Sequence, residues 1–206
     1  MKDTKMLCGE IVDIEWEMFY ATQNIGGQAS CQQNRGRFEI MRHAQFENWD
    51  GESLENYLAD LKSALARGDN LVTLKYAYMM ASTDPEGYAR IAHMLPEISA
   101  EKREIVERLT ARTVEWCESF ASEYPAVSGR GRSIRSSEDN MFNTSVETYS
   151  RGEFSSYGMD TLRSLVRHYE MLAAEGKNLH KMVAASEMRM LGYESMDAAE
   201  AAARGH

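Results

Sequence analysis

Apolar residues recur at helical spacing along most of this 206-residue chain, and that periodicity limits its fold more than any other feature. In residues 6–23, for example, Ile11, Ile14, Met18 and Phe19 fall near one face of a helix. No stretch sustains the alternation of β-branched residues that is typical of a strand. The pattern predicts an all-α fold, a helical bundle, with helices over about residues 6–23, 37–49, 52–67, 71–82, 85–95, 100–124, 159–175 and 179–191.

Residues at the ends of these segments support the same boundaries. Gly68 and Gly176 stand where a helix that ends in the left-handed conformation needs glycine. Asn70 and Asn178 can cap the helices that follow, and Asp84 precedes a proline at the first position of the next helix. We therefore expect a helical hairpin that turns at Gly-x-Asn-Leu in each half of the chain.

The chain also resembles itself. The segment ALARGDNL at 64–71 returns as LAAEGKNL at 172–179, an offset of 108 residues. We interpret the similarity as an internal duplication that gives two pseudo-symmetric halves, about 6–96 and 99–192, within one domain over 1–195. The Ala-rich end, 196–206, is expected to be a frayed helix or a disordered tail. The pairs that match are Phe46 with Phe154, Trp49 with Tyr157, Leu54 with Leu162 and, at an offset of 100, Glu15 with Glu115.

Composition excludes several classes of partner. A formal net charge of −9 disfavours nucleic acid and anionic membranes, because both need a basic surface. The first residues are acidic where a signal peptide needs an apolar core, and no stretch approaches the ~18 apolar residues of a membrane span. Cys8, Cys31 and Cys117 lack paired CxxC spacing, which favours reduced thiols over disulfides or zinc. We expect a cytoplasmic protein that binds neither nucleic acid nor membrane, of unknown oligomeric state.

The two halves differ most in the loop after their long helix, at 24–36 and 128–152. Loops on a rigid scaffold often carry binding chemistry, and two loops related by pseudo-symmetry would form one cleft. Arg130, Arg132 and Arg135 concentrate positive charge in the second loop, and guanidinium groups bind carboxylate or phosphate in bidentate fashion. The alternative is that these arginines pair with Glu138, Asp139 and other acidic residues only to hold the loop in place.

Five segments, taken in order, resemble a known family. GGQASCQ, FEIMRHAQFENW, GDNLVTLKYAYMM, RGRSIRSSEDN and NTSVETYSRGE are similar to the DUF4125 family of bacterial proteins of unknown function, over about residues 11–191. The resemblance implies no activity, although some members resemble fusions to a nucleotidyltransferase-like domain. The motif positions that it implies are Gly26, Gly27, Ser30, Cys31, Arg42, Gln45, Lys75, Tyr76, Arg135, Glu138, Asp139, Ser145, Glu147 and Tyr149.

Other chemistries have weaker support. Cys31 lies twelve residues before His43, so a thiolate that imidazole activates is one hypothesis and a small buried cysteine is the alternative. Lys75 is either a buried base or a lysine that reaches solvent along an apolar face. A carboxylate-bridged metal pair is disfavoured because the Glu-x-x-His motif is absent, and Glu39 with His43 is the nearest substitute. We predict no metal site, and the cofactor is unknown.

Three functional hypotheses stay open. The leading one is an enzyme that binds an anionic small molecule, a carboxylate or a phosphate, in a cleft formed by loops 24–36 and 128–152. The second is a non-catalytic ligand-binding or accessory module that works with a nucleotidyltransferase-like partner, and the third is a structural or interaction protein. The catalytic candidates are Glu138, Asp139, Tyr149 and Cys31, and the ligand-binding candidates are Arg130, Arg132, Arg135, Ser30, Gln32, Arg42, Lys75 and Asn143.

Overall fold

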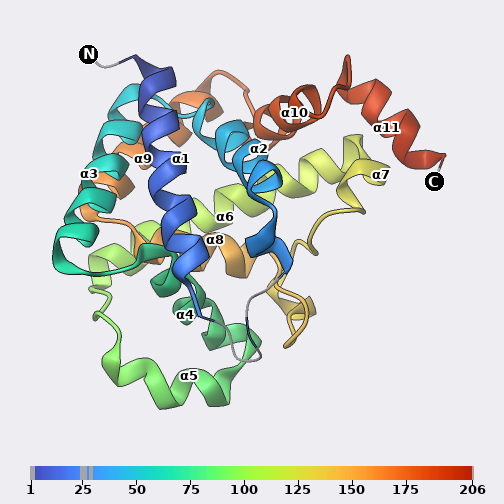
Figure 1. Cartoon of the computed structure of the whole chain (residues 1–206). Coiled ribbons are helices and arrows are strands. Elements are labelled where there is room, and N and C mark those ends of the chain that lie inside the picture. The colour runs from blue at the N-terminus through green and yellow to red at the C-terminus, as the bar shows by residue number, and fades with distance from the viewer. Residues whose placement is uncertain (1–2, 24–26, 28–29, 206) are drawn as a thin grey trace.

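The computed structural model describes residues 3–23, 27 and 30–205, and over these residues the chain forms eleven α-helices and no β-strand (Figure 1). The all-α prediction is therefore confirmed. None of the described helices is long and apolar enough to cross a bilayer. The helices are α1 (Thr4–Ala21), α2 (Arg35–Phe46), α3 (Gly51–Arg67), α4 (Leu71–Thr83), α5 (Pro85–Ile91), α6 (Ala100–Glu123), α7 (Pro125–Ser128), α8 (Val146–Ser156), α9 (Met159–Ala174), α10 (Leu179–Met190) and α11 (Met196–Arg204), with 3-10 turns η1 (Ser30–Gln33), η2 (Ala92–Met94) and η3 (Ser136–Glu138).

The two predicted hairpin turns have the same geometry. Gly68 and Gly176 have φ angles of +77° and +67°, the left-handed conformation that glycine adopts without strain. Asn70 caps α4 and Asn178 caps α10, each by accepting a hydrogen bond of 2.9 Å from the backbone N–H three residues on. Each amide also donates to a backbone carbonyl of the long helix in its own half, at 2.7 Å for Asn70 and 2.9 Å for Asn178. These turns therefore tie each hairpin to α1 or α6.

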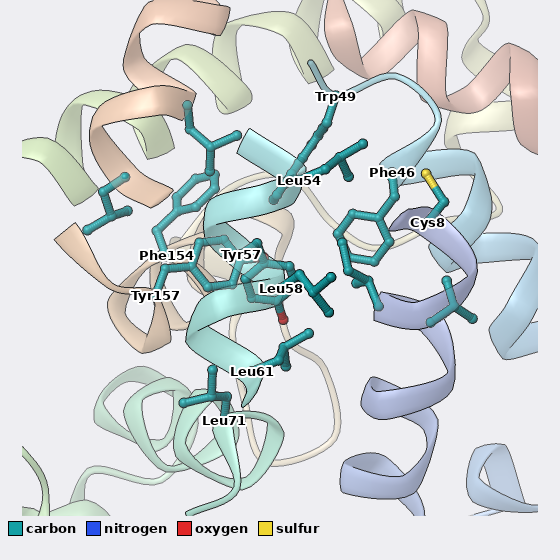
Figure 2. Packing of buried hydrophobic residues seen from close by; sticks show 14 of the residues in the cluster. Cys8, Phe46, Trp49, Leu54, Tyr57, Leu58, Leu61, Leu71, Phe154 and Tyr157 are labelled. Carbon is teal, nitrogen blue, oxygen red and sulfur yellow. The ribbon is translucent and has the colours of Figure 1, made fainter. Parts of the chain in front are cut away.

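The core forms where α3 packs against α1 and α9. Leu61 of α3 and Leu165 of α9 are completely buried. Next to them lies an aromatic cluster, which Figure 2 shows at the end of α2 and along α3 and α8. The rings of Tyr57 and Tyr157 lie 4.6 Å apart between centroids, within the range in which aromatic pairs attract one another.

The helices of the two halves follow the same order, with α1 to α4 matching α6 and α8 to α10. Packing runs crosswise between the halves, because α4 contacts α8, α10 contacts α2, and α3 contacts α9. A pseudo-twofold axis would produce this arrangement, and the duplication itself stays a prediction. Glu15 and Glu115 do not share an environment, since their side chains are 3% and 61% exposed.

The loop that was expected to continue to residue 152 ends at Ser145, which caps α8 by accepting from the N–H of Thr148 at 3.2 Å. Apart from Phe154, the buried face of α8 is made of small and polar residues, so it lacks the apolar periodicity that predicts a helix. Gly152 shows why side chains on this face must be small: a Cβ there would lie 2.5 Å from the Met79 side chain and 2.9 Å from the Lys75 carbonyl oxygen of α4. Glycine lets the two helices approach closely.

The C-terminal segment is a helix packed on the body, which corrects the expectation of a frayed or disordered tail. Figure 1 shows α11 beside α7 at one end of the molecule, and the two helices are in contact. The buried carboxylate of Glu200 accepts hydrogen bonds from the N–H groups of Ala126 and Val127, at 2.9 and 2.8 Å. This carboxylate satisfies two backbone donors at the start of α7.

Candidate functional site

A buried network of charged side chains joins four helices. Arg42 of α2 donates two hydrogen bonds to the carboxylate of Glu15 on α1, at 2.5 and 2.6 Å. The same guanidinium donates to Glu153 of α8 at 3.0 Å and to Gln45 at 2.8 Å. Tyr57 of α3 donates to Glu15 at 2.5 Å. Arg42 and the two glutamates are each at most 5% exposed, so the network lies inside the protein.

Lys75 of α4 completes this network. Its ammonium donates to the hydroxyl of Tyr149 at 2.8 Å and lies 3.5 Å from a carboxylate oxygen of Glu153. Burial opposes the charge of Lys75, but Tyr149 and Glu153 outweigh burial and raise the pKa of Lys75 above its usual range. Burial likewise opposes the charge of Glu153, but the cations of Arg42 and Lys75 lower the pKa of that carboxyl.

The network therefore holds two cations and two carboxylates that compensate one another. Groups that are buried and mutually paired hold helices in register, and a buried pair of this kind is weak support for catalysis by itself. Of the sequence candidates, Arg42 and Lys75 fall in this network, and Tyr149 lies at its edge. Glu153 was missed, although it ends the segment NTSVETYSRGE, because nothing in its spacing indicates which helices surround it.

A cavity of about 140 Å³, which we call the inner cavity, adjoins the network between α2, α6, α8 and α10. Glu153 and Gln45 form part of its wall and belong to the network as well. Its other polar lining residues are Thr113, Tyr149, Ser150 and His180, and its aromatic ones include Trp49, Trp116, Phe154 and Tyr169. The inner cavity thus combines aromatic walls with hydrogen-bonding groups, a combination common in small-molecule sites.

A larger cavity of about 400 Å³, the outer cleft, lies between α10, α7, α11 and residues 130–134. Val146, His180 and Val183 line both cavities, so the two meet there. Most of the outer cleft is apolar, with side chains such as those of Phe120 and Met188. The two cavities share these wall residues and together make up the candidate site beside the charge network.

Three arginines line the outer cleft. Arg130 donates to the carbonyl oxygen of Ala203 at 2.7 Å. Arg132 donates to the carbonyl oxygen of Thr144 at 3.2 Å, and its guanidinium lies over the ring of Tyr149, 4.8 Å from the centroid.

The third arginine differs in its partner. Arg37 forms an ion pair of 2.5 Å with Glu187, which also lines the cleft. Among the described residues, no carboxylate pairs with Arg130 or Arg132, so the cleft carries positive charge that protein groups leave uncompensated.

His180 stands at the junction of the two cavities. Its ring packs edge-on against Phe120, with 5.1 Å between centroids, and none of the described residues hydrogen-bonds to its ring nitrogens. Burial lowers the pKa of His180 to about 4, so the imidazole is neutral at pH 7. The sequence did not identify His180 as a site residue, because it has no partner in the sequence that is typical of a metal or ligand site.

The remaining candidates of the 128–145 loop hold the loop itself. Asp139 accepts from the hydroxyls of Ser82 and Thr148 and from the backbone N–H of Ser145. Burial opposes ionisation of Asp139, but these hydrogen bonds outweigh it and lower its pKa. Asn143 donates to the hydroxyl of Ser133 at 2.9 Å.

Arg135 and Glu138 lie on the outside of this loop. Arg135 pairs with Glu118 of α6 at 2.6 Å, and Glu138 is exposed. Neither these two residues nor Asp139 and Asn143 are among those that line the inner cavity or the outer cleft.

In the described part of the first loop, Gln32 is buried, whereas Gly27 and residues 33–36 are exposed. Gln32 is 1% exposed and donates to the carbonyl oxygens of Phe19 and Thr22, both at 2.8 Å. It therefore closes the end of α1. The backbone of Ser30 and Cys31 belongs to η1, but their side chains lie outside what the structure describes, as does Gly26. None of the described residues from 24 to 36 lines the outer cleft.

Candidate metal ligands are dispersed. Among the described residues, no group of three or more His, Cys, Asp or Glu side chains is arranged to hold a metal ion. Glu39 pairs with Arg35, Glu115 with Arg112 and Glu170 with Arg108.

Comparison with known proteins gives a family and no activity. A family model described as a protein of unknown function, DUF4125, matches residues 5–201 of the chain. No curated protein matches, and no solved structure matches. Because the match spans nearly the whole chain, this protein belongs to the DUF4125 family.

Proposed function

We propose that the protein binds a small anionic molecule, a carboxylate or a phosphate with an apolar part, in the outer cleft. The observation that carries the proposal is the pair Arg130 and Arg132, whose side chains donate only to backbone carbonyl oxygens among the described residues. Their charges have no carboxylate partner there, and a guanidinium fork suits carboxylate and phosphate oxygens. In a chain of net charge −9, such a local excess of positive charge is distinctive.

The walls of the cleft support an amphipathic ligand over a bare inorganic anion. The cleft holds about 400 Å³ and is lined mainly by aliphatic and aromatic side chains behind the arginines. Burial of apolar surface contributes about 25 cal/mol for each Å² removed from water, so an apolar body would add affinity that a bare anion lacks.

Binding without chemistry is the simpler form of this proposal, because Glu138 and Asp139 stand outside both cavities and the buried network is internally paired. The fused relatives that the sequence resemblance implies would then make the protein an accessory module of a nucleotidyltransferase-like partner. One observation favours an enzyme as the second candidate: His180 is a neutral imidazole without a hydrogen-bond partner among the described residues, and it lies where the two cavities meet.

A thermal-shift screen against carboxylates and phosphorylated compounds tests the binding proposal. A ligand at 100 times its Kd stabilises a protein by ~2.7 kcal/mol, or roughly 5–10 °C for a chain of this length. We expect a hit whose shift falls in Arg130→Ala and Arg132→Ala. Arg135→Ala is the matched control, because it removes the same charge from the same loop while its partner Glu118 lies outside the cleft. A hit that Arg135→Ala weakens equally, or a screen without any anion hit, contradicts the proposal.

The same hit separates the two forms of the proposal. Incubation of wild type with the hit, followed by NMR of the small molecule, detects turnover. If the protein is an enzyme, His180→Asn retains the thermal shift and loses turnover. If wild type leaves the compound unchanged, the protein is a binding module for it.

A further inference from the structure

The inner cavity lies where the two halves of the chain carry different side chains. At the offset of 108 residues, Ser150 corresponds to Arg42 and Val183 corresponds to Lys75. Arg42 and Lys75 lie in the charge network, in which the guanidinium and the ammonium both approach Glu153. Ser150 and Val183 instead line the inner cavity. The cavity therefore lies beside short side chains at the positions where the other half carries Arg42 and Lys75.

Glu153 gives the wall of the inner cavity a hydrogen-bond acceptor whose charge is already offset by Arg42 and Lys75. Among the described residues, Oε2 of Glu153 accepts one long hydrogen bond, from Gln45 at 3.5 Å, whereas Oε1 accepts a hydrogen bond from Arg42 at 3.0 Å. Arg42 and Lys75 already offset the charge of the two buried carboxylates. A charged ligand group would therefore lose its hydration here without gaining a counterion. A neutral hydrogen-bond donor, in contrast, would satisfy Oε2 of Glu153, which can accept a further hydrogen bond.

The size of the inner cavity and the residues of its wall further limit the chemical group that it can hold. A cavity of about 140 Å³ is close to the ~150 Å³ of an engineered apolar cavity that takes up benzene. Trp49, Trp116 and Tyr169 line it, and aromatic side chains attract other rings by stacking and edge contacts.

The geometry points to the inner cavity as a subsite for one uncharged aromatic ring that bears a hydroxyl or N–H donor, which Glu153 accepts. The outer cleft would hold the anionic part of the same molecule, so the identity of the whole ligand rests on the proposed function. His180 lines both cavities and would lie beside the bond that joins the two parts. The ligand class is thus a phenol, aniline or N–H heterocycle that carries a carboxylate or phosphate group.

Uncharged fragments test the subsite separately from the arginine cleft. Phenol and toluene have similar size, and only phenol donates a hydrogen bond. In NMR titrations of the full chain, we expect phenol to bind about tenfold more tightly than toluene, because toluene leaves the acceptor unsatisfied. Ser150→Leu fills the cavity and should abolish phenol binding, and Val183→Phe should do the same from α10. Arg130→Ala alters a side chain that lines the outer cleft and not the inner cavity, and it should leave the phenol affinity unchanged.

The outcomes are distinguishable. Equal binding of phenol and toluene, or phenol binding that survives both filling variants while circular dichroism shows them folded, overturns the subsite. If either filling variant fails to fold, the comparison of phenol with toluene in wild type still decides the donor requirement. A protein that prefers phenol but gives no anion hit retains the subsite and loses the outer-cleft proposal.

Discussion

Replacement of Arg42 by methionine tests whether the charge network is as buried and as closely paired as its geometry indicates. Methionine has similar length and helix propensity, so the change removes the charge and five donors with little loss of volume. Glu15 would lose two hydrogen bonds of 2.5 and 2.6 Å, and Glu153 would lose one of 3.0 Å. Only Lys75 would then remain to offset two buried carboxylates.

The expected cost is about 3–5 kcal/mol in the free energy of unfolding at pH 7.5, the usual result when one partner of a buried ion pair is removed. For a chain of this length, the corresponding fall in Tm is roughly 6–20 °C. Urea denaturation followed by circular dichroism measures the loss. Arg163→Met is the matched control: Arg163 pairs with Glu101 at 2.7 Å with both side chains at least half exposed, and should lose no more than ~1 kcal/mol.

The dependence on pH supplies a second, independent readout. In wild type, the network lowers the pKa of Glu153, so its stabilisation is present above the unfolded pKa of about 4.3 and is lost as pH falls through the folded value. In Arg42→Met, burial without the guanidinium should raise the pKa of Glu153 in the folded state. The folded variant then binds more protons than the unfolded chain, and its deficit relative to wild type should shrink between pH 7.5 and 5.5. A loss no larger than that of Arg163→Met, or a deficit that is the same at both pH values, would refute the reasoning.

Three other substitutions or modifications probe the scaffold. Asp139→Ala removes three hydrogen bonds that hold the 128–145 loop, so we expect a loss of about 1–3 kcal/mol and faster tryptic cleavage of the loop. Because the folded pKa of Asp139 is lowered, the difference from wild type should begin to shrink below about pH 4 and be lost as pH falls through the folded value. Gly152→Ala should lower stability by about 1–3 kcal/mol in urea denaturation. Gly36→Ala on α2, where the added Cβ would meet only the Asn34 side chain at 4.0 Å, should be neutral or stabilising. Burial raises the pKa of Cys8 to about 11 and that of Cys117 to about 12, so mass spectrometry after alkylation at pH 8 should find both thiols unmodified until urea unfolds the chain.

The parts of the fold that depend on local chemistry could be predicted from the sequence. Gly68 and Asn70 end one helix and begin the next through interactions within a few residues, and periodicity identifies the long helices. Most of helix α8 was expected to be loop because, apart from Phe154, its buried face consists of small and polar residues such as Gly152. Two helices that pack closely need small side chains between them, and a search for periodic apolar residues does not detect such a contact.

The candidate site depends on contacts between distant parts of the chain. Glu15, Arg42, Lys75 and Glu153 come from four helices, and no spacing between them indicates that they meet. The 128–145 loop was identified as a candidate binding loop because three arginines lie close together in its sequence. Even so, only packing distinguishes Arg132, which lines the cleft, from Arg135, which pairs with Glu118 outside it.

The same crosswise packing explains why a closed network and an open cavity occur side by side. Long charged side chains fill the contact between α4 and α8, and shorter ones leave the inner cavity where α10 meets α2. A leucine in place of Ser150 would bury apolar side-chain surface in this space and should raise the stability of the protein, by about 25 cal/mol for each Å² removed from water. If urea denaturation shows Ser150→Leu to be more stable than wild type, the open inner cavity lowers the stability of the protein, which is the result expected if this space holds a ligand as proposed.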